Sequence, residues 1–193
     1  GEMRARLARL LGGEPVGMWV GTFHAIGARL LRVNAKYVNR TSAFTIYDED
    51  DILGTVKRVM EAKRLSTRDF TPKAVHSVIS DAKNALVLPA EYAALASDPL
   101  SRVAAQVYSD LERTMQEQNA VDFDDLLLLP VQLFRAHPDR LEKYSEMFRY
   151  ILVDEYQDTN RAQYMLIKLL GRHGNVAVVG DDDQCLVRGT IIT

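Results

Sequence analysis

Two acidic segments in the last quarter of the sequence contain the residues best suited to chemistry. The first, Val-Asp-Glu-Tyr-Gln-Asp-Thr-Asn over 153–160, overlaps the end of the apolar run 150–153. Such a run predicts a buried strand of a parallel sheet, and ligands of these sheets bind where the strands end. Of the two acids there, Asp154 and Glu155, one can hold Mg²⁺, and the other can orient and deprotonate a water that attacks a terminal phosphate. A polar turn is the alternative for a bare Asp-Glu pair, but the whole octet favours the functional interpretation.

The second segment, Gly-Asp-Asp-Asp-Gln over 180–184, follows the apolar run 176–179. A strand, a helix and a strand at this spacing predict a βαβ unit, which places the two segments side by side. Gly180 permits a sharp turn there. We expect Asp181 and Gln184 to bind a nucleotide, with Gln184 hydrogen-bonding the γ-phosphate. Three consecutive aspartates could also form a simple solvated turn.

A third candidate is Gly-Thr-Phe-His at 21–24, at the end of a short strand expected over 18–23. A helix is expected to follow over 25–38, and it carries two arginines. Thr22 and His24 offer donors suited to phosphate, and Phe23 offers a ring on which a base could stack. A lone histidine is more often structural, but these neighbours favour DNA contact.

The remaining elements must position these groups. A strand is expected over 44–47, and Asp48 is the expected N-cap of the next helix. Residues 66–119 are expected to be helical throughout, with prolines at helix starts. These are Pro72, Pro89 and Pro99. An apolar helix is expected over 123–134 after Asp122.

Three further features bear on these later helices. Asp122 and Asp125 have the spacing of a capping box. Pro130 falls inside the expected apolar helix and predicts a kink, and Pro138 begins another helix. The helix after the first acidic segment has three possible caps, Asp158, Thr159 and Asn160.

The composition is that of an ordinary soluble globular protein. Hydrophobic residues make up 47% and charged residues 26% of 193 residues, enough for one core with a small added lobe. Without a membrane-spanning run or a signal peptide, a cytoplasmic location is expected. A single cysteine, Cys185, excludes an internal disulfide and a multi-cysteine zinc site. The net charge of −2 does not by itself indicate nucleic-acid binding, although residues 1–40 are basic and 122–158 acidic.

Four segments together resemble the first RecA-like motor domain of superfamily 1 DNA helicases of the UvrD/Rep/PcrA type. They are GTFHAIGARLLR (21–32), VDFDDLL (121–127), YILVDEYQDTNRAQY (150–164) and VAVVGDDDQ (176–184). GEMRARL, at the start of the chain, is similar to the end of an earlier DNA-contact motif of that family. The order and approximate spacing match over nearly the whole chain.

The resemblance implies an α/β fold: the RecA-like parallel sheet of a P-loop NTPase, without its phosphate-loop strand, and an inserted all-helical lobe. The motor domain 1A would comprise 1–65 and 120–184, and the lobe 1B, which contacts duplex DNA, would comprise 66–119. It further implies ATP and Mg²⁺ as cofactors, and a second motor domain in the parent chain. The family moves 3′ to 5′ on single-stranded DNA and unwinds the duplex.

The resemblance also implies residue roles. Asp154 would hold Mg²⁺, Glu155 would handle the attacking water, and Gln184 would sense the γ-phosphate. The segment Thr22–His24 would touch single-stranded DNA. No G-x-x-x-x-G-K-[ST] phosphate loop occurs in the 193 residues, and the family carries it upstream of residue 1. We therefore expect weak ATP binding and no helicase activity from this chain alone.

The last nine residues depart from the family pattern, which continues with aromatic residues that stack on DNA bases. Residues 185–193 read Cys-Leu-Val-Arg-Gly-Thr-Ile-Ile-Thr, which resembles the start of an intein. Cys185 would then be the nucleophile that attacks the carbonyl of Gln184. Drift or a frameshift is the alternative. Nine residues cannot form an intein, so we expect no splicing.

Two other functions stay open at this point. One is a related ATP-dependent helicase–nuclease subunit, which a distant nuclease domain would distinguish. The other is a non-catalytic DNA-binding module with vestigial acids. The intact Asp-Glu-x-Gln-Asp pattern at 154–158 argues against such decay.

Overall fold

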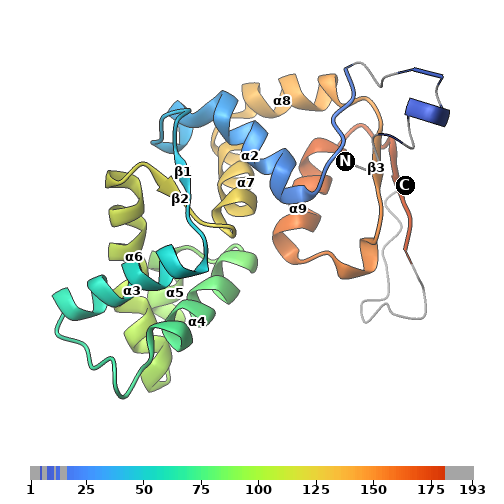
Figure 1. Cartoon of the computed structure of the whole chain (residues 1–193). Coiled ribbons are helices and arrows are strands. Elements are labelled where there is room, and N and C mark those ends of the chain that lie inside the picture. Colours follow the sequence, from blue (N-terminus) through green and yellow to red (C-terminus); the bar gives the residue numbers. More distant parts are fainter. Residues whose placement is uncertain (1–4, 6–7, 11, 14–16, 181–193) are drawn as a thin grey trace.

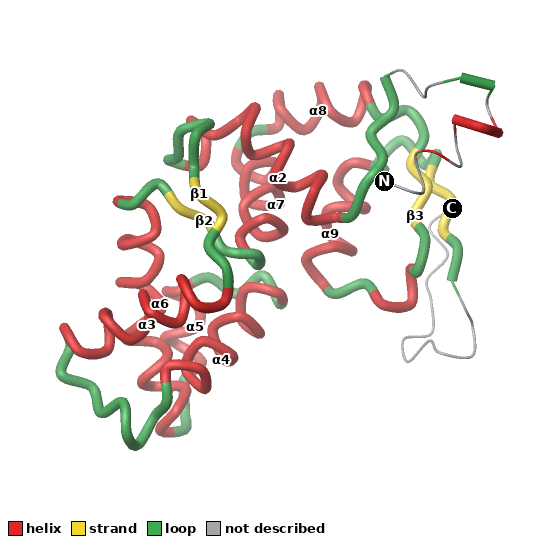
Figure 2. The backbone as a smooth tube through the Cα atoms, viewed as in Figure 1, coloured by secondary structure: helices red, strands yellow, loops and turns green. Residues whose placement is uncertain are grey.

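The computed structural model describes residues 5, 8–10, 12–13 and 17–180 (Figure 1). The α-helices defined there are α2 (Phe23–Asn34), α3 (Glu49–Ala62), α4 (Pro72–Asn84), α5 (Pro89–Leu95), α6 (Pro99–Glu117), α7 (Asp125–Ala136), α8 (Pro138–Met147) and α9 (Arg161–Leu170). Two 3-10 helices are η1 (Ala35–Val38) and η2 (Tyr156–Asp158), and the strands are β1 (Thr45–Ile46), β2 (Ala120–Val121), β3 (Ile151–Val153) and β4 (Val176–Val178). Helix dominates the described chain, as Figure 2 shows.

Local capping determines where most of these helices begin. Asp48 is the N-cap of α3, as predicted: it accepts a hydrogen bond from the backbone N–H of Asp51. The Asp51 side chain bonds back to the Asp48 N–H, which completes a capping box that was not predicted. Asn160 makes the same reciprocal arrangement with Gln163 at the start of α9. Prolines begin α4, α5, α6 and α8 at the predicted positions, where a missing N–H costs nothing.

The strands form two parallel pairs. β1 pairs with β2, with Thr45 opposite Ala120, and β3 pairs with β4, with Ile151 opposite Val176. Helix α9 connects β3 to β4, so the predicted βαβ unit is present. The α/β class with parallel strands is confirmed.

The helices gather around two hydrophobic cores, which lie at opposite ends of the view in Figure 1. The first core lies among α2, α7, α8 and α9 and includes Leu31, Phe134 and Leu166. The second lies among α3, α4 and α6 and includes Val56, Ile79 and Leu111. The expected lobe at 66–119 contains α4, α5 and α6, and α3 also packs in the second core. The predicted lobe boundary stays a prediction.

The strand expected over 18–23 was wrong, because the chain enters α2 there without pairing in a sheet. Thr22 is the N-cap of α2 and accepts a hydrogen bond from the Ala25 N–H at 3.2 Å, which turns the backbone into the helix. The apolar side chain of Trp19 in this segment packs against another part of the chain instead. The ring of Trp19 packs edge-on against Phe148, with centroids 5.0 Å apart.

Three other expectations need comment. Burial of β3 on both faces was wrong: Val153 is buried, but Leu152 is 72% exposed, because β3 pairs only with β4 among the described residues. The apolar helix begins at Asp125 rather than at Phe123, and it contains Pro130 as predicted. The helical spacing of Leu7, Leu10 and Leu11 predicts a helix over 2–11. Ala5 and residues 8–10 are helical there, and the other residues of that range lie outside the described part of the chain. No helix in the described part of the chain is long and apolar enough to cross a membrane.

Candidate functional site

The first acidic segment forms an exposed loop directly after β3. The Asp154 carboxylate accepts a hydrogen bond from the backbone N–H of Glu155 at 3.0 Å. The Glu155 carboxylate accepts one from the side-chain amide of Gln157. Both acids are exposed, so carboxylate oxygens face solvent at the carboxyl end of a parallel strand. This is where a cation or phosphate ligand would bind in such a sheet.

Glu155 has a strained backbone. Its φ of 52° and ψ of 42° lie in the left-handed region, which costs a residue with a Cβ roughly 1–2 kcal/mol. Strain of this kind is concentrated at functional sites, where the surrounding structure holds it in place. The conformation supports a functional interpretation of this loop.

The second acidic segment begins beside the first. The Val179 N–H donates to the Val153 carbonyl at 2.8 Å, and the Tyr156 N–H donates to the Val179 carbonyl at 3.0 Å. A Cβ on Gly180 would come within 2.5 Å of the Gln157 side-chain oxygen and 3.4 Å of the Gln157 backbone nitrogen, so Gly180 lies directly against this loop. The start of the second segment therefore lies against the loop after β3. Asp181, Gln184 and Cys185 lie outside the described residues, and their roles stay predictions.

Thr22, Phe23 and His24 lie at the amino end of α2. The His24 ring lies 5.4 Å from the ring of Phe123, measured between centroids, and Phe123 is 57% exposed. Phe123 was not predicted as a site residue, but its exposure beside His24 makes it a further candidate for base stacking. Figure 1 shows that α2 and the loop after β3 belong to the same half of the molecule.

The two arginines of α2 contact the protein itself. The Arg32 guanidinium donates to the carbonyl oxygens of Ser42 and Phe44, both at 2.6 Å. The Arg29 guanidinium lies 3.9 Å from the centre of the Trp19 ring, a cation–π contact. Arg32 therefore stabilises the fold locally, by linking α2 to the segment that leads into β1.

A buried group of charges was missed entirely from the sequence. The Lys83 ammonium is fully buried and lies 2.8 Å from carboxylate oxygens of Asp122, Asp125 and Glu112. Lys83 belongs to α4 and Glu112 to α6, whereas Asp125 begins α7. We call these four residues the Lys83 cluster. It joins the helices of the second core to the central helix of the first.

In the Lys83 cluster, attraction to the carboxylates more than offsets the cost of burying the Lys83 ammonium. Burial disfavours the ammonium, but Asp122, Asp125 and Glu112 hold the pKa of Lys83 well above its usual value. Burial would likewise raise the pKa of Asp122, but Lys83 more than offsets it and lowers that pKa. Burial and the neighbouring Asp122 carboxylate raise the pKa of Asp125 well above its usual value. One acid of the pair is thus held ionised and the other is driven toward its neutral form.

A chain of side-chain amides connects the first acidic segment to Asp124, next to the Lys83 cluster. The Asn160 amide, at the cap of α9, donates to the Asn84 side-chain oxygen at 2.7 Å. The Asn84 amide donates in turn to Asp124 at 2.9 Å. Asn84 directly follows Lys83 in α4, so the end of this helix contacts both α7 and the loop that leads from Glu155 to α9.

The sequence contains a weak signal for the Lys83 cluster. Lys83 lies four residues after Ile79 and eight after Val75, which places it on the buried stripe of α4. A lysine on an apolar stripe requires buried partners. The spacing of Asp122 and Asp125 was explained by a capping box. Their reciprocal bonds at 2.8 and 3.1 Å do form, but α7 begins only at Asp125, and its N-cap Asp124 makes no side-chain capping bond. The capping interpretation also concealed their contact with Lys83.

Comparison with known proteins gives a consistent result. The chain matches the family described as "UvrD/REP helicase N-terminal domain" over residues 1–188. It is 39% identical over 188 residues to the "ATP-dependent DNA helicase PcrA" of Bacillus subtilis, covering 97% of this chain and 25% of that protein. Proteins of the same name from Leuconostoc citreum and Staphylococcus aureus are 40% identical over 96% of the chain. The chain spans about a quarter of the length of these relatives.

Proposed function

Because the chain belongs to the UvrD/REP helicase N-terminal domain family, we propose that it is part of the motor of an ATP-dependent 3′–5′ DNA helicase. Such a motor couples ATP hydrolysis to movement along single-stranded DNA and to unwinding of the duplex. The observation that carries the proposal is the exposed Asp154–Glu155 pair at the carboxyl end of β3, with the second acidic segment beginning against it. The name shared by the relatives favours a helicase over a helicase–nuclease subunit or a non-catalytic module.

The residues at this loop fit a magnesium–nucleotide complex. Carboxylate oxygens are the protein ligands that Mg²⁺ prefers, and both acids are accessible to solvent. When bound, the ion neutralises charge on the terminal phosphates. Asp154 would hold the ion, and Glu155 would orient the attacking water and accept its proton. Asp181 and Gln184 would contact the nucleotide from the second segment.

DNA would contact the amino end of α2. Thr22 and His24 would meet the phosphate backbone, and Phe23 would offer its ring to a base. The helical cluster around α4 and α6 supports an inserted lobe over 66–119 that meets the duplex. The motor domain would comprise 1–65 and 120–184, with a second motor domain in the complete protein. The intein interpretation of residues 185–193 rests on their sequence alone.

A chimera tests the proposal in a complete motor. Residues 1–184 would replace the matching segment of the Bacillus subtilis relative, which is 39% identical to this chain. We expect the chimera to retain DNA-stimulated ATP hydrolysis. Glu155→Gln should lower the hydrolysis rate by about 10²–10⁴-fold while DNA binding persists, because the water loses its base. Phosphate release and DNA fluorescence anisotropy measure the two properties.

Glu146→Gln provides the matched control, since Glu146 is an exposed glutamate on α8 away from the loop. It should hydrolyse ATP like the unmodified chimera. Equal hydrolysis by the Glu155→Gln and Glu146→Gln chimeras would refute the role of Glu155. The 193-residue chain alone should show no unwinding, because its sequence has no phosphate loop. ATP-dependent unwinding by the purified chain would contradict that expectation.

A further inference from the structure

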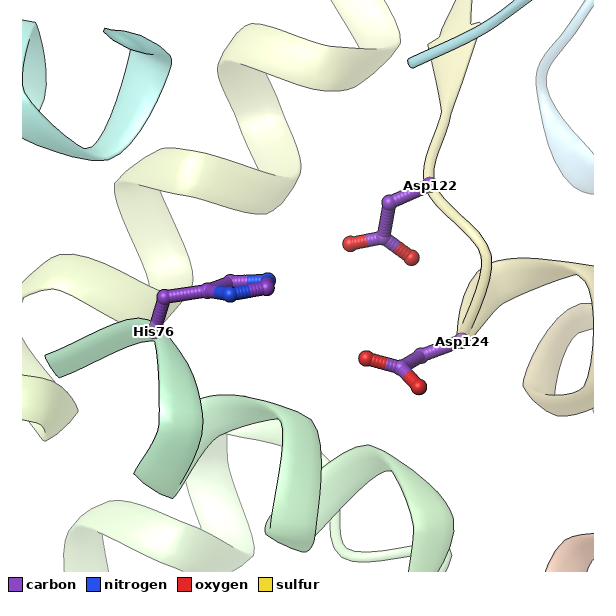
Figure 3. Close-up of side chains that lie close together, drawn as sticks. All are labelled: His76, Asp122 and Asp124. Atoms are coloured by element: carbon purple, nitrogen blue, oxygen red, sulfur yellow. The ribbon is translucent and has the colours of Figure 1, made fainter. Parts of the chain in front are cut away.

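Three side chains with metal-binding groups converge between the second core and α7 (Figure 3). His76 comes from α4, Asp122 follows β2, and Asp124 immediately precedes α7. One donor atom from each lies within 4.8 Å of the others. We propose that these residues bind one divalent transition-metal ion, zinc or manganese, which ties α4 to the start of α7.

The imidazole of His76 faces the two carboxylates. Figure 3 shows its ring directed toward them, and its interaction with Asp122 is electrostatic, with no hydrogen bond between His76 and another residue in the described part of the chain. The half-buried ring faces acids without bonding to either, so the space between them suits a shared ligand. An ion there would satisfy all three groups at once.

Both carboxylates are already oriented by neighbours. Asp122 accepts from the Lys83 ammonium and from the Asp125 N–H, each at 2.8 Å. Asp124 accepts from the Asn84 amide at 2.9 Å. Metal ligands are commonly held by such a second layer of hydrogen bonds, which fixes the carboxylate while leaving lone pairs for the ion.

The local charge balance favours a cation. Four carboxylates lie around the site, those of Asp122, Asp124, Asp125 and Glu112. Two cations oppose them, Lys83 in direct contact and Arg40 through electrostatic attraction to the Lys83 cluster. The four carboxylates outnumber the two cations, and a divalent ion would offset this excess of negative charge.

The donor set indicates the class of ion. One imidazole nitrogen with carboxylate oxygens suits zinc or manganese, whereas Mg²⁺ and Ca²⁺ prefer oxygen alone. Metal–donor distances of about 2.0–2.2 Å require the three side chains to draw closer by small rotations. Three protein ligands leave a coordination position for water. The site is thus distinct in chemistry from the magnesium site proposed at Asp154.

Metal titration of the whole 193-residue chain tests the proposal. Cys185→Ser would be the background, because a free thiol binds the same ions. Calorimetry with Zn²⁺, and visible absorption with Co²⁺ as a probe, should give one site per chain, and Zn²⁺ should raise the melting temperature. His76→Gln should weaken binding by at least 10–100-fold and abolish the melting shift. Asp124→Asn, which keeps an oxygen for Asn84, should weaken binding similarly.

Two control variants separate this site from others. His173→Gln removes an exposed histidine elsewhere, and Glu146→Gln removes an exposed carboxylate on α8; both should bind Zn²⁺ like the background. Binding by His76→Gln and Asp124→Asn equal to the background would overturn the proposal. So would the absence of one-site binding by the background chain itself.

Discussion

The Lys83 cluster and the loop after β3 both contain acids, but in opposite settings. In the Lys83 cluster, Asp122 and Asp125 are almost fully buried, and each contacts the ammonium and a backbone N–H. In the loop, Asp154 and Glu155 are exposed, and their hydrogen bonds to described residues stay within the loop. The buried acids are committed to holding helices together, whereas the exposed acids keep oxygens available for a ligand.

The difference shows how this chain separates stability from chemistry. A buried charge must be paired, because an unpaired one is costly, so the Lys83 cluster tolerates little change. The loop carries backbone strain at Glu155, which works against stability. Burial alone would have selected the acids of the Lys83 cluster rather than Asp154 and Glu155, the acids proposed for the chemistry.

Lys83→Met, which removes the buried cation, should have the largest effect on stability. It should lower the free energy of unfolding by about 3–5 kcal/mol, because buried carboxylates lose their counter-charge. Urea unfolding at neutral pH measures the change. Lys73→Met is the matched control, since Lys73 is 78% exposed and pairs with Glu49 at 3.5 Å on the surface. A loss below about 1 kcal/mol for Lys83→Met would contradict the assigned role.

Gly27→Ala tests the packing between α2 and α7. A Cβ at Gly27 would overlap the Leu126 carbonyl oxygen, which is backbone and cannot move aside cheaply. We expect a loss of about 1–3 kcal/mol in urea unfolding. Gly54→Ala in α3 should instead gain roughly 0.5–1 kcal/mol, because its Cβ would meet nothing closer than 3.7 Å. The same sign for both variants would refute this contrast.

Glu155→Gly tests whether the backbone of the loop after β3 is strained. Glycine adopts the left-handed backbone without steric cost, so we expect the free energy of unfolding to rise by about 1 kcal/mol. Glu155→Gln keeps the strain and should change stability by less than about 0.5 kcal/mol. Thermal unfolding distinguishes the two. A clear loss of stability in Glu155→Gly would show that the conformation is not strained.

The smallest effect is expected from a surface pair, which also has a defined pH dependence. Lys63 lies 2.5 Å from the Asp110 carboxylate, and their hydrogen bond lowers the pKa of Asp110. Because the pKa of Asp110 is lower in the folded protein than its usual value of 3.8, the ionised carboxylate stabilises the fold at pH values above 3.8. This stabilisation is lost as the pH falls from 3.8 through the lowered pKa of the folded protein. Asp110→Asn should therefore cost about 0.2–1 kcal/mol at pH 7, and the cost should vanish in acid. Urea unfolding of both proteins over a pH series measures this.

Local chemistry made much of the fold predictable. Helix starts at Asp48 and Asn160 depend on side chains within three residues of the cap, so the sequence contains the complete interaction. The apolar runs that became β3 and β4 likewise predicted parallel pairing, because each is followed by polar residues at the same sheet edge. The exposed pair Asp154 and Glu155 could be chosen as candidates for the same reason.

Features that depend on contacts between residues far apart in the sequence became visible only in the tertiary structure. The segment around Trp19 looked like a strand because apolar residues suit either state, and the packing of its ring against Phe148 is visible only in the fold. Lys83 and Asp125 lie 42 residues apart, and no local pattern states that they meet at 2.8 Å. Helix caps, the pairing of β3 with β4 and the candidate acids could be predicted from the sequence, because those features are local or periodic, whereas the pairing of β1 with β2 could not. Only the fold decided which charges are buried together, because burial depends on how separate elements pack.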